Sequence, residues 1–305
     1  MASNRDGPTV LSQNDGAKVL VQYIRQHTPF AAGKLGTSEL NVLWFYINHR
    51  QQRVKTPYPW YTVTDITVNA GLFPATDQAI DEWADHMFKN VLPTMDILAE
   101  WIKNDQERLI LNMVAPYSTR IPARSIEPYY EADTADRWTY NIPESTKIAV
   151  ISPFAQSISK QWQHQTKIWP NTPVWSSNLT LVPIQCGYSP SLQSNPTSPN
   201  AWPIEIQKAG WNAAVHSMVG AAAASGSTLA IVGAGCLSLP IVAGLKAKGI
   251  TAIHMGGATQ ILFGIKGRRW LSHEIISRLF NDVWVFPSAN EVPDRAGHVE
   301  GGCYW

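Results

Sequence analysis

One acidic residue, Glu39, stands where a strand is expected to pass into a helix. The segment FAAGKL is predicted to be a short strand that turns at Gly36, and a helix is predicted from Thr37 to about His49. Thr37, Ser38 and Glu39 would form the first helical turn, where hydroxyls and carboxylates satisfy free amides. A helix start also presents its amides to phosphate groups. The segment is therefore either a helix cap or part of an anion-binding or nucleotide-binding site.

Three further predicted strands end in loops that suit ligand binding. These loops contain Ser152, Phe154, Gly233, Gly235, Gly256 and Gly257. Ligands of open α/β sheets bind at the carboxyl ends of the strands. The Gly233-x-Gly235 pair has Ser238 at the third glycine position and lacks the acidic residue about twenty positions later, which disfavours NAD(P). The glycines either admit a diphosphate or serve only tight turns.

The composition suits a soluble globular protein. The 305 residues are 45% hydrophobic and 15% charged, and the net charge of +1 gives no overall attraction to nucleic acid. The three cysteines are widely spaced and show no C-x-x-C pattern, which argues against a disulfide framework. The start MASNRDGPTV does not look like a signal peptide, and no apolar stretch is long enough for a membrane span. We therefore expect a cytoplasmic protein.

Predicted strands alternate with predicted helices along the chain. In the first half, the predicted strands are FAAGKL, YTVTDITVN and RLILNMV. The predicted helices are GAKVLVQYIRQH and the stretch from Thr76 to Ile102, which is kinked or divided at Pro93. In the second half, KIAVISPF, NLTLVPI, STLAIVGAG and ITAIHMGGA alternate with helices and end in a βαβ unit, which predicts a mostly parallel sheet. We expect one domain over residues 1–305, with at most an internal division near 146 and a flexible loop over 186–202.

Several segments carry a resemblance to a known family. They are GKLGTSEL, ISPFAQSI, VGAGCLSLPIVAGLKAKGITAIHMGGATQILFGIKGRRW and EVPDRAGHVEGGCYW. They resemble glycosyltransferases from polysaccharide-biosynthesis loci of bacteria and from large algal viruses, among whose relatives are chlorovirus xylosyltransferase-type enzymes. The order of elements is also similar to the GT-D class of glycosyltransferases. The resemblance implies a Rossmann-like, GT-D-like fold that transfers a sugar from a nucleoside diphosphate sugar, with UDP-sugars and UDP-xylose as the leading donors.

The resemblance also implies roles for individual residues. Glu39 matches the glutamate of the Asp-x-Glu motif that binds metal and nucleotide diphosphate in the GT-D class, while Thr37 replaces the aspartate. One carboxylate holds Mn²⁺ or Mg²⁺ poorly, because these ions prefer several hard oxygen ligands. The cation would then be held mainly by the sugar nucleotide. Donor binding would involve Lys34, Gly36, Thr37 and Ser38 together with the three strand-end loops.

Sugar transfer further requires positive charge for the leaving diphosphate and, in an inverting enzyme, a base for the acceptor hydroxyl. The candidate counter-charges are Lys34, Lys266, Arg268 and Arg269, three of which lie in the cluster KGRR, which is otherwise a solvated turn. The candidate bases are Asp65, Asp96, His254 and Glu300. We favour Asp65, because it lies in a strand-like run, whereas helix-dipole complementarity accounts for Asp96. His254 is otherwise a core histidine, and Glu300 belongs to a tail that either covers the site or docks to the core.

The sequence thus predicts a glycosyltransferase that acts in glycan assembly with a glycan acceptor, in the host cytoplasm if the chain is viral. The alternatives are another nucleotide-dependent transferase, such as a methyltransferase or pyruvyltransferase, and a non-catalytic glycan-binding protein. Nucleotide binding separates the enzymes from the glycan-binding protein. The sequence leaves the donor sugar, the acceptor, the stereochemical outcome and the oligomeric state open.

Overall fold

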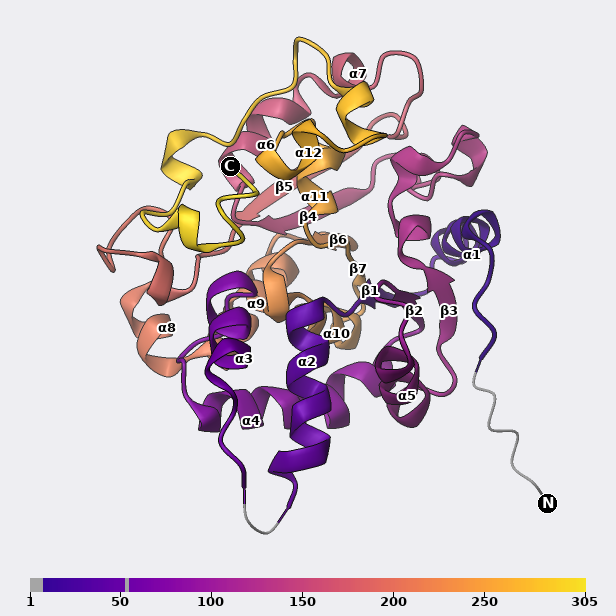
Figure 1. Ribbon diagram of the computed structural model, residues 1–305. Coiled ribbons are helices and arrows are strands. Elements are labelled where there is room, and N and C mark those ends of the chain that lie inside the picture. Colours follow the sequence, from indigo (N-terminus) through magenta and orange to yellow (C-terminus); the bar gives the residue numbers. More distant parts are fainter. Residues whose placement is uncertain (1–7, 53–54) are drawn as a thin grey trace, which may run out of the picture.

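The centre of the fold is a parallel sheet with the strand order β3-β2-β1-β7-β6-β4-β5 (Figure 1). This computed structural model describes residues 8–52 and 55–305. Residues 1–7 and 53–54 lie outside the description, and the first of these ranges is most of the segment MASNRDGPTV, in which no signal peptide was recognised. The strands are β1 (Ala31–Lys34), β2 (Ile97–Glu100), β3 (Thr119–Pro122), β4 (Lys147–Ser152), β5 (Thr180–Gln185), β6 (Leu229–Val232) and β7 (Thr251–His254). Every adjacent pair is parallel, which confirms the predicted α/β class.

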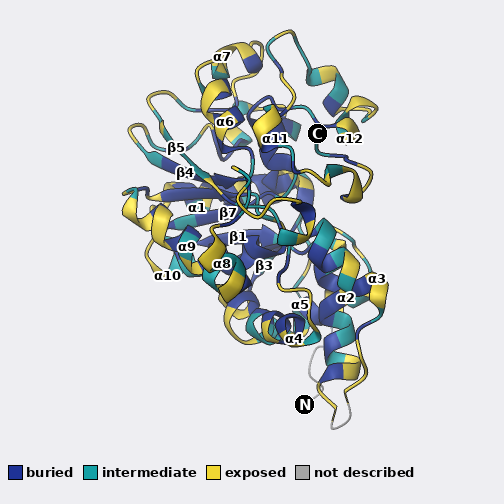
Figure 2. Ribbon diagram, turned by 90° about the vertical axis from the view of Figure 1, so that its left-hand side faces the viewer, coloured by how far each residue is buried: buried dark blue, intermediate teal, exposed yellow. Residues whose placement is uncertain are grey.

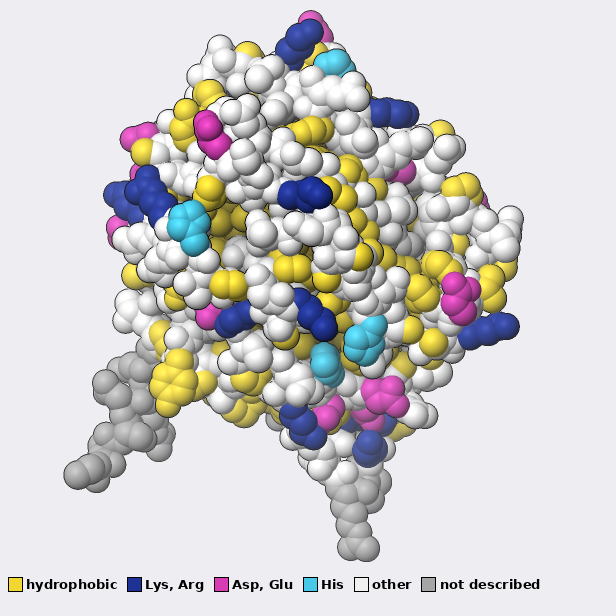
Figure 3. All heavy atoms as spheres, turned by 180° about the vertical axis from the view of Figure 1, so that it is seen from behind, with side chains coloured by type: hydrophobic (Ala, Val, Ile, Leu, Met, Phe, Trp, Pro, Cys, Tyr) yellow, Lys and Arg dark blue, Asp and Glu magenta, His cyan; other side chains and the backbone are white. Residues whose placement is uncertain are grey.

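Helices cover both faces of this sheet. They are α1 (Gln13–Arg25), α2 (Thr37–Phe45), α3 (Trp60–Thr64), α4 (Asp77–His86), α5 (Asp105–Val114), α6 (Ala155–Trp162), α7 (Gln165–Ile168), α8 (Ile204–Ala209), α9 (Trp211–Ala224), α10 (Ser238–Ala247), α11 (Ala258–Leu262) and α12 (Arg268–Leu271). Within the described ranges, no helix is both long and apolar enough to cross a membrane. On the face shown in Figure 3, side chains of both charges are interspersed.

Two hydrophobic cores lie on opposite faces of the sheet, because neighbouring side chains of a strand point in opposite directions. In β4, Ala149 and Ile151 belong to the core beneath α2, α4, α9 and α10, while Ile148 and Val150 belong to the core beneath α1, α6 and α11. The central strands are accordingly buried, whereas the edge strand β5 is only partly covered (Figure 2). Strands from before and after residue 146 belong to the same sheet, since β1 pairs with β7.

Most of the second half was predicted correctly, including β4 to β7 and the βαβ unit. The segment IEIQKAGWNAAVHSMVGAAAA (204–224), which the sequence predicts to be one of the helices of this half, is divided into α8 and α9 at Gly210, whose φ of +89° falls in the region that glycine adopts readily. The loop over 186–202 contains a single bridge between Tyr188 and Ala201 and a short helical turn, Pro190–Leu192. Its predicted flexibility stays a prediction.

Two predicted strands of the first half are wrong. The run 61–69 is helical, as α3 followed by a π-helical turn (Asp65–Asn69), because the buried Thr62 and Ile66 recur at helical spacing. Its β-branched residues are accommodated there, since the Thr67 hydroxyl donates to the Val63 carbonyl.

The run 108–114 lies in helix α5, which Asn104 caps by accepting a hydrogen bond from the Glu107 amide. The predicted continuation of a helix through residues 95–102 is wrong too, because Ile97–Glu100 forms the buried strand β2. Four buried residues are too few to distinguish a helix from a strand by periodicity alone.

Candidate active site at the carboxyl edge of the sheet

A cavity of about 590 Å³ opens at the carboxyl edge of the sheet. The loops after all seven strands contribute to its wall. Its size lies within the range of about 300–1,000 Å³ that is usual for small-molecule sites. It also lies at a topological switch point of the sheet. From β1 the chain continues to β2 on one side of the sheet, whereas β7, which neighbours β1 on the other side, follows β6 in the chain.

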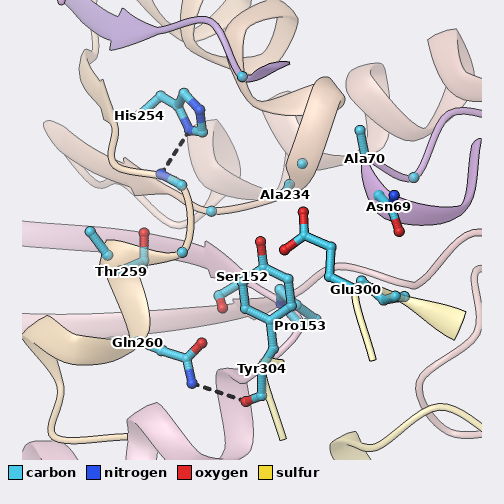
Figure 4. Close-up of a pocket in the computed structure, with 18 of the residues that line it drawn as sticks. Asn69, Ala70, Ser152, Pro153, Ala234, His254, Thr259, Gln260, Glu300 and Tyr304 are labelled. Carbon is cyan, nitrogen blue, oxygen red and sulfur yellow. Dashed lines mark hydrogen bonds between the residues drawn. The ribbon is translucent and has the colours of Figure 1, made fainter. Parts of the chain in front are cut away.

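Most of the residues singled out in the sequence lie together in this cavity. They are Lys34, Gly36, Thr37, Ser38, Glu39, Ser152, Phe154, Gly233, Gly235, His254, Gly256, Gly257, Arg269 and Glu300. Figure 4 shows that Ser152, His254 and Glu300, which are far apart in the sequence, surround one space.

Four of the proposed site residues, Asp65, Lys266, Arg268 and Asp96, do not line the cavity. Asp65 is on the helical segment rather than in a strand, and its carboxylate accepts a hydrogen bond from Asn69, which itself reaches the cavity (Figure 4). The Lys266 amino group lies 5.5 Å from the centre of the Phe280 ring. Arg268 is exposed on the outer surface. The reason for favouring Asp65 as the base, its position in a strand, is therefore wrong.

Asp96, the other acidic residue considered as a base, has a structural role. Its carboxylate accepts a hydrogen bond from the Ala31 amide at 2.8 Å and forms an ion pair with Lys246 at 2.7 Å. It therefore fixes the start of β1 to α10, outside the cavity lining.

Glu39 lies in the first turn of α2, which begins at Gly36 without a capping side chain. Its carboxylate folds back over Gly36, where a Cβ atom would lie only 2.3 Å from the Glu39 Oε2. Burial, with a smaller contribution from the negative charge of Glu300, raises the pKa of Glu39 from 4.5 to about 6. Across residues 8–52 and 55–305, no basic side chain pairs with this carboxylate.

Glu300 and Arg269 line the cavity as an ion pair. Arg269 Nη2 donates to Glu300 Oε2 at 2.9 Å, and its guanidinium lies 4.8 Å from the centre of the Tyr304 ring. The turn that presents Glu300 uses Gly301 and Gly302, both with φ between +70° and +80°, and Glu300 itself has a φ of +45°. A non-glycine residue in this region is uncommon and often marks a functional position.

His254 ends β7 and is buried in the cavity wall. Its Nδ1 lies 3.0 Å from the Val232 carbonyl oxygen and 3.2 Å from the Gly256 amide, a contact drawn in Figure 4. Burial lowers the pKa of His254 from 6.5 to about 4, and the nearby Lys34 adds to this effect. The imidazole is therefore neutral at pH 7, with one nitrogen committed to the backbone.

The glycines of the strand-end loops admit other parts of the chain. A Cβ atom at Gly235 would lie 2.1 Å from the Ala70 carbonyl oxygen, and one at Gly257 would lie 2.9 Å from the Tyr304 ring. At Gly233 it would meet the Thr259 hydroxyl at 2.8 Å. Close packing accounts for these three glycines without a diphosphate.

Sequence reasoning missed the loops after β2 and β3. Trp101, Arg124, Glu127 and Tyr130 line the cavity there, and Glu127 forms an ion pair of 3.2 Å with Lys34. It also missed Tyr304 and Trp305, which close the cavity from the C-terminal segment, residues 288–305. The aromatic and charged residue types in these loops were the available signal, but their contact partners are far away in the sequence.

The residues present do not by themselves make a metal centre. No group of three His, Cys, Asp or Glu side chains in the described part of the chain is placed to hold a metal ion. Position 37 offers a hydroxyl instead of a carboxylate, and Glu300 is already paired with Arg269. We therefore assign no step to Mn²⁺ or Mg²⁺ held by the protein.

The comparisons with known proteins are sparse. No protein-family model and no curated protein sequence matches the chain. A solved structure titled "Selenomethionine substituted structure of domain of unknown function 1792 (DUF1792)" is similar with a TM-score of 0.36 and 12% identity, over 83% of this chain and 79% of that one. This degree of similarity supports no inference about activity. The fold and the cavity define an α/β protein with a candidate ligand site at a sheet switch point, and the glycosyltransferase resemblance stays a hypothesis.

Proposed function

We propose that the protein is a glycosyltransferase that transfers a sugar from a nucleoside diphosphate sugar to a hydroxyl of a glycan. The observation that carries this proposal is the buried Glu39 carboxylate, whose pKa is raised to about 6 inside a large cavity that also contains an arginine. A carboxylate of this pKa is ionised at neutral pH and accepts a proton more readily than an ordinary glutamate.

The part of the cavity near Arg269 suits the donor. An arginine offers a planar set of donors to a diphosphate. Two neighbouring buried acceptors, Thr259 Oγ1 and Gln260 Oε1, have no hydrogen-bond partner among the described residues. Buried polar atoms normally have partners, so a nucleotide or sugar hydroxyl is a fitting one. Figure 4 shows the Gln260 side chain next to Tyr304, whose carbonyl accepts a hydrogen bond from it, and Thr259 on the same stretch of chain.

Glu39 is the best placed base for the acceptor hydroxyl. Asp65 and Asp96 lie outside the cavity lining, and Glu300 is engaged by Arg269. Glu39 follows β1, and β1 lies between β2 and β7 in the sheet, so Glu39 enters the cavity wall between the loops that follow those two strands. In this mechanism it takes the proton of the attacking hydroxyl while Arg269 compensates the charge of the departing diphosphate.

A thermal-shift panel of UDP, GDP, CMP and S-adenosylmethionine, each with and without Mn²⁺, tests the donor class. We expect a nucleoside diphosphate, and UDP above the others, to raise the melting temperature, because a ligand that binds only the folded state stabilises it. Because position 37 lacks the carboxylate, we expect part of this effect to persist in EDTA. A shift with S-adenosylmethionine alone would identify a methyltransferase instead, and no shift with any millimolar nucleotide would contradict the proposal.

A further inference from the structure

The cavity has a second end, formed by the loops after β2 and β3. These two strands form one edge of the sheet, on the opposite side of β1 from β7, β6 and β4 (Figure 1). Strands lie about 4.8 Å apart, so the end of β2 is separated by roughly 10 Å from the end of β7, the strand that Thr259, Gln260 and Arg269 follow. Glu39, at the start of the helix after β1, lies between them.

An aromatic wall marks this second end. Trp101 lines the cavity and keeps 49% of its surface exposed, although large aromatic residues are usually buried. The Lys34 amino group lies 4.3 Å from the centre of its ring. Tyr130 lines the same end and contacts the Arg124 guanidinium, 4.9 Å from the ring centre. Exposed aromatic rings in a cavity offer flat apolar surface for the C–H face of a sugar ring.

A buried ion pair accompanies the aromatic rings. Glu127 accepts hydrogen bonds from Lys34 at 3.2 Å and from the Tyr129 hydroxyl at 3.0 Å. A buried ion pair stabilises a fold no better than a well-packed apolar pair of the same size. Recognition of a polar ligand explains the position of the Lys34–Glu127 ion pair in the cavity wall better, since the pair holds two charged groups in a fixed geometry.

The charge of this end is positive. Lys34 is paired with Glu127, whereas Arg124 is exposed and pairs with no carboxylate of the described residues. Its side chain is held over Tyr130, so its planar donors are available to an anionic group.

We propose that this end binds the acceptor and that the acceptor is an acidic glycan, with a sugar ring stacked on Trp101 and a carboxylate or phosphate substituent paired with Arg124. The inference rests on the proposed function only in that the bound sugar would present its hydroxyl to Glu39. Both residues are surface-accessible, so their replacement does not disturb the core.

Isothermal titration calorimetry tests this with a tetramer of galacturonate, a phosphomannan tetramer, neutral maltotetraose and, separately, UDP. We expect at least one anionic tetramer to bind at least fivefold more tightly than maltotetraose, and the tighter one identifies the anionic group. Trp101→Ala should weaken this binding at least tenfold, and Arg124→Gln should remove the preference for the anionic tetramer. The matched controls Trp60→Ala and Arg268→Gln change an exposed tryptophan and an exposed arginine outside the cavity lining, and should have no effect.

The outcomes separate this inference from the proposed function. If UDP binds but no anionic tetramer is preferred, or if Trp101→Ala leaves glycan affinity unchanged, the acidic acceptor site is overturned and the donor proposal stands. If Trp101→Ala weakens UDP instead, this end belongs to the nucleotide and the inference is overturned as well. If the anionic tetramer binds through Trp101 and Arg124 but no nucleotide binds, the glycan site is supported and the transferase proposal fails.

Discussion

Replacing Glu39 with glutamine should make the protein more stable at neutral pH. The folded state holds this carboxylate in a buried place without a basic partner, and its pKa is raised from 4.5 to about 6. Between these two pH values the folded protein binds more protons than the unfolded chain, so stability falls as the pH rises. The contribution of Glu39 is fully present below pH 4.5 and is lost once the pH passes about 6.

The magnitude follows from the same pKa difference. One pKa unit corresponds to about 1.4 kcal/mol, so the ionised Glu39 lowers the free energy of unfolding at pH 7.5 by about 2 kcal/mol. Glutamine has nearly the same shape, fills the same place over Gly36 and carries no charge. We therefore expect Glu39→Gln to raise the free energy of unfolding by up to about 2 kcal/mol at pH 7.5 and to leave it unchanged near pH 4.

Urea unfolding of the wild type and the variant at pH 7.5, 6 and 4 measures this difference. Glu205→Gln is the matched control, because Glu205 is an exposed carboxylate in the first turn of α8. Loss of a favourable interaction with the helix dipole should make that variant less stable by about 0.3–1 kcal/mol. The reasoning is refuted if Glu39→Gln is destabilised like the control at pH 7.5, since Glu39 would then be an ordinary helix cap.

The same substitution should remove activity. If Glu39 accepts the proton of the acceptor hydroxyl, transfer by Glu39→Gln should fall at least about a hundredfold, as is usual when a general base is lost. A protein that becomes more stable while it loses turnover would show that a charge is kept in the cavity at the expense of the fold. Full transfer activity in the stabilised variant would assign Glu39 no chemical role.

Two further predictions concern the cavity walls. Arg269→Gln should weaken UDP binding at least tenfold, because a hydrogen bond to a charged group is worth about 1.5–3 kcal/mol. Arg268→Gln, outside the cavity, should change UDP affinity less than twofold. Equal effects of the two substitutions in calorimetry would show that Arg269 has no specific role in binding UDP. Between pH 7.5 and pH 4, the free energy of unfolding of the wild type should fall by about 3 kcal/mol more than that of His254→Asn. The reason is that the pKa of His254 is about 4 in the folded state and 6.5 in the unfolded chain, so the unfolded chain takes up its proton first as the pH falls. Parallel unfolding profiles of the two proteins over this pH range would contradict the assignment of a buried neutral imidazole.

The part of the site that could be predicted from the sequence lies next to recognisable strand ends. Ser152, Gly233 and His254 each follow a run of buried apolar residues, and parallel strands bring their carboxyl ends to one edge. Glu39 was found in the same way, because Gly36 separates a strand from a helix start. These positions depend on local pattern together with a general rule of α/β folds.

The first half of the chain was harder for a physical reason. β2 and β3 have only four residues each, and the helix α5 between them reads as an apolar run with the same residue types as a strand. In the segment 61–69, β-branched residues favour a strand, but packing of one face against the core makes it helical. Whether a short segment of this kind forms a helix or a strand is determined by its tertiary contacts.

The errors in those elements explain why the proposed acceptor end was missed and the base was misplaced. With residues 108–114 taken as a strand and 97–100 as helix, the ends of β2 and β3 do not exist, so Trp101 and Glu127 have no reason to lie together. With 61–69 taken as a strand, Asp65 falls inside a strand-like run, where a carboxylate without a functional role would be unexpected. The ion pair between Lys34 and Glu127 shows what the local pattern lacks, because it joins residues 93 positions apart through the order β3-β2-β1. Only the correct strand order places the aromatic and basic loops after β2 and β3 next to the strand that leads to Glu39, a residue that the sequence marks as a helix cap or part of an anion-binding or nucleotide-binding site.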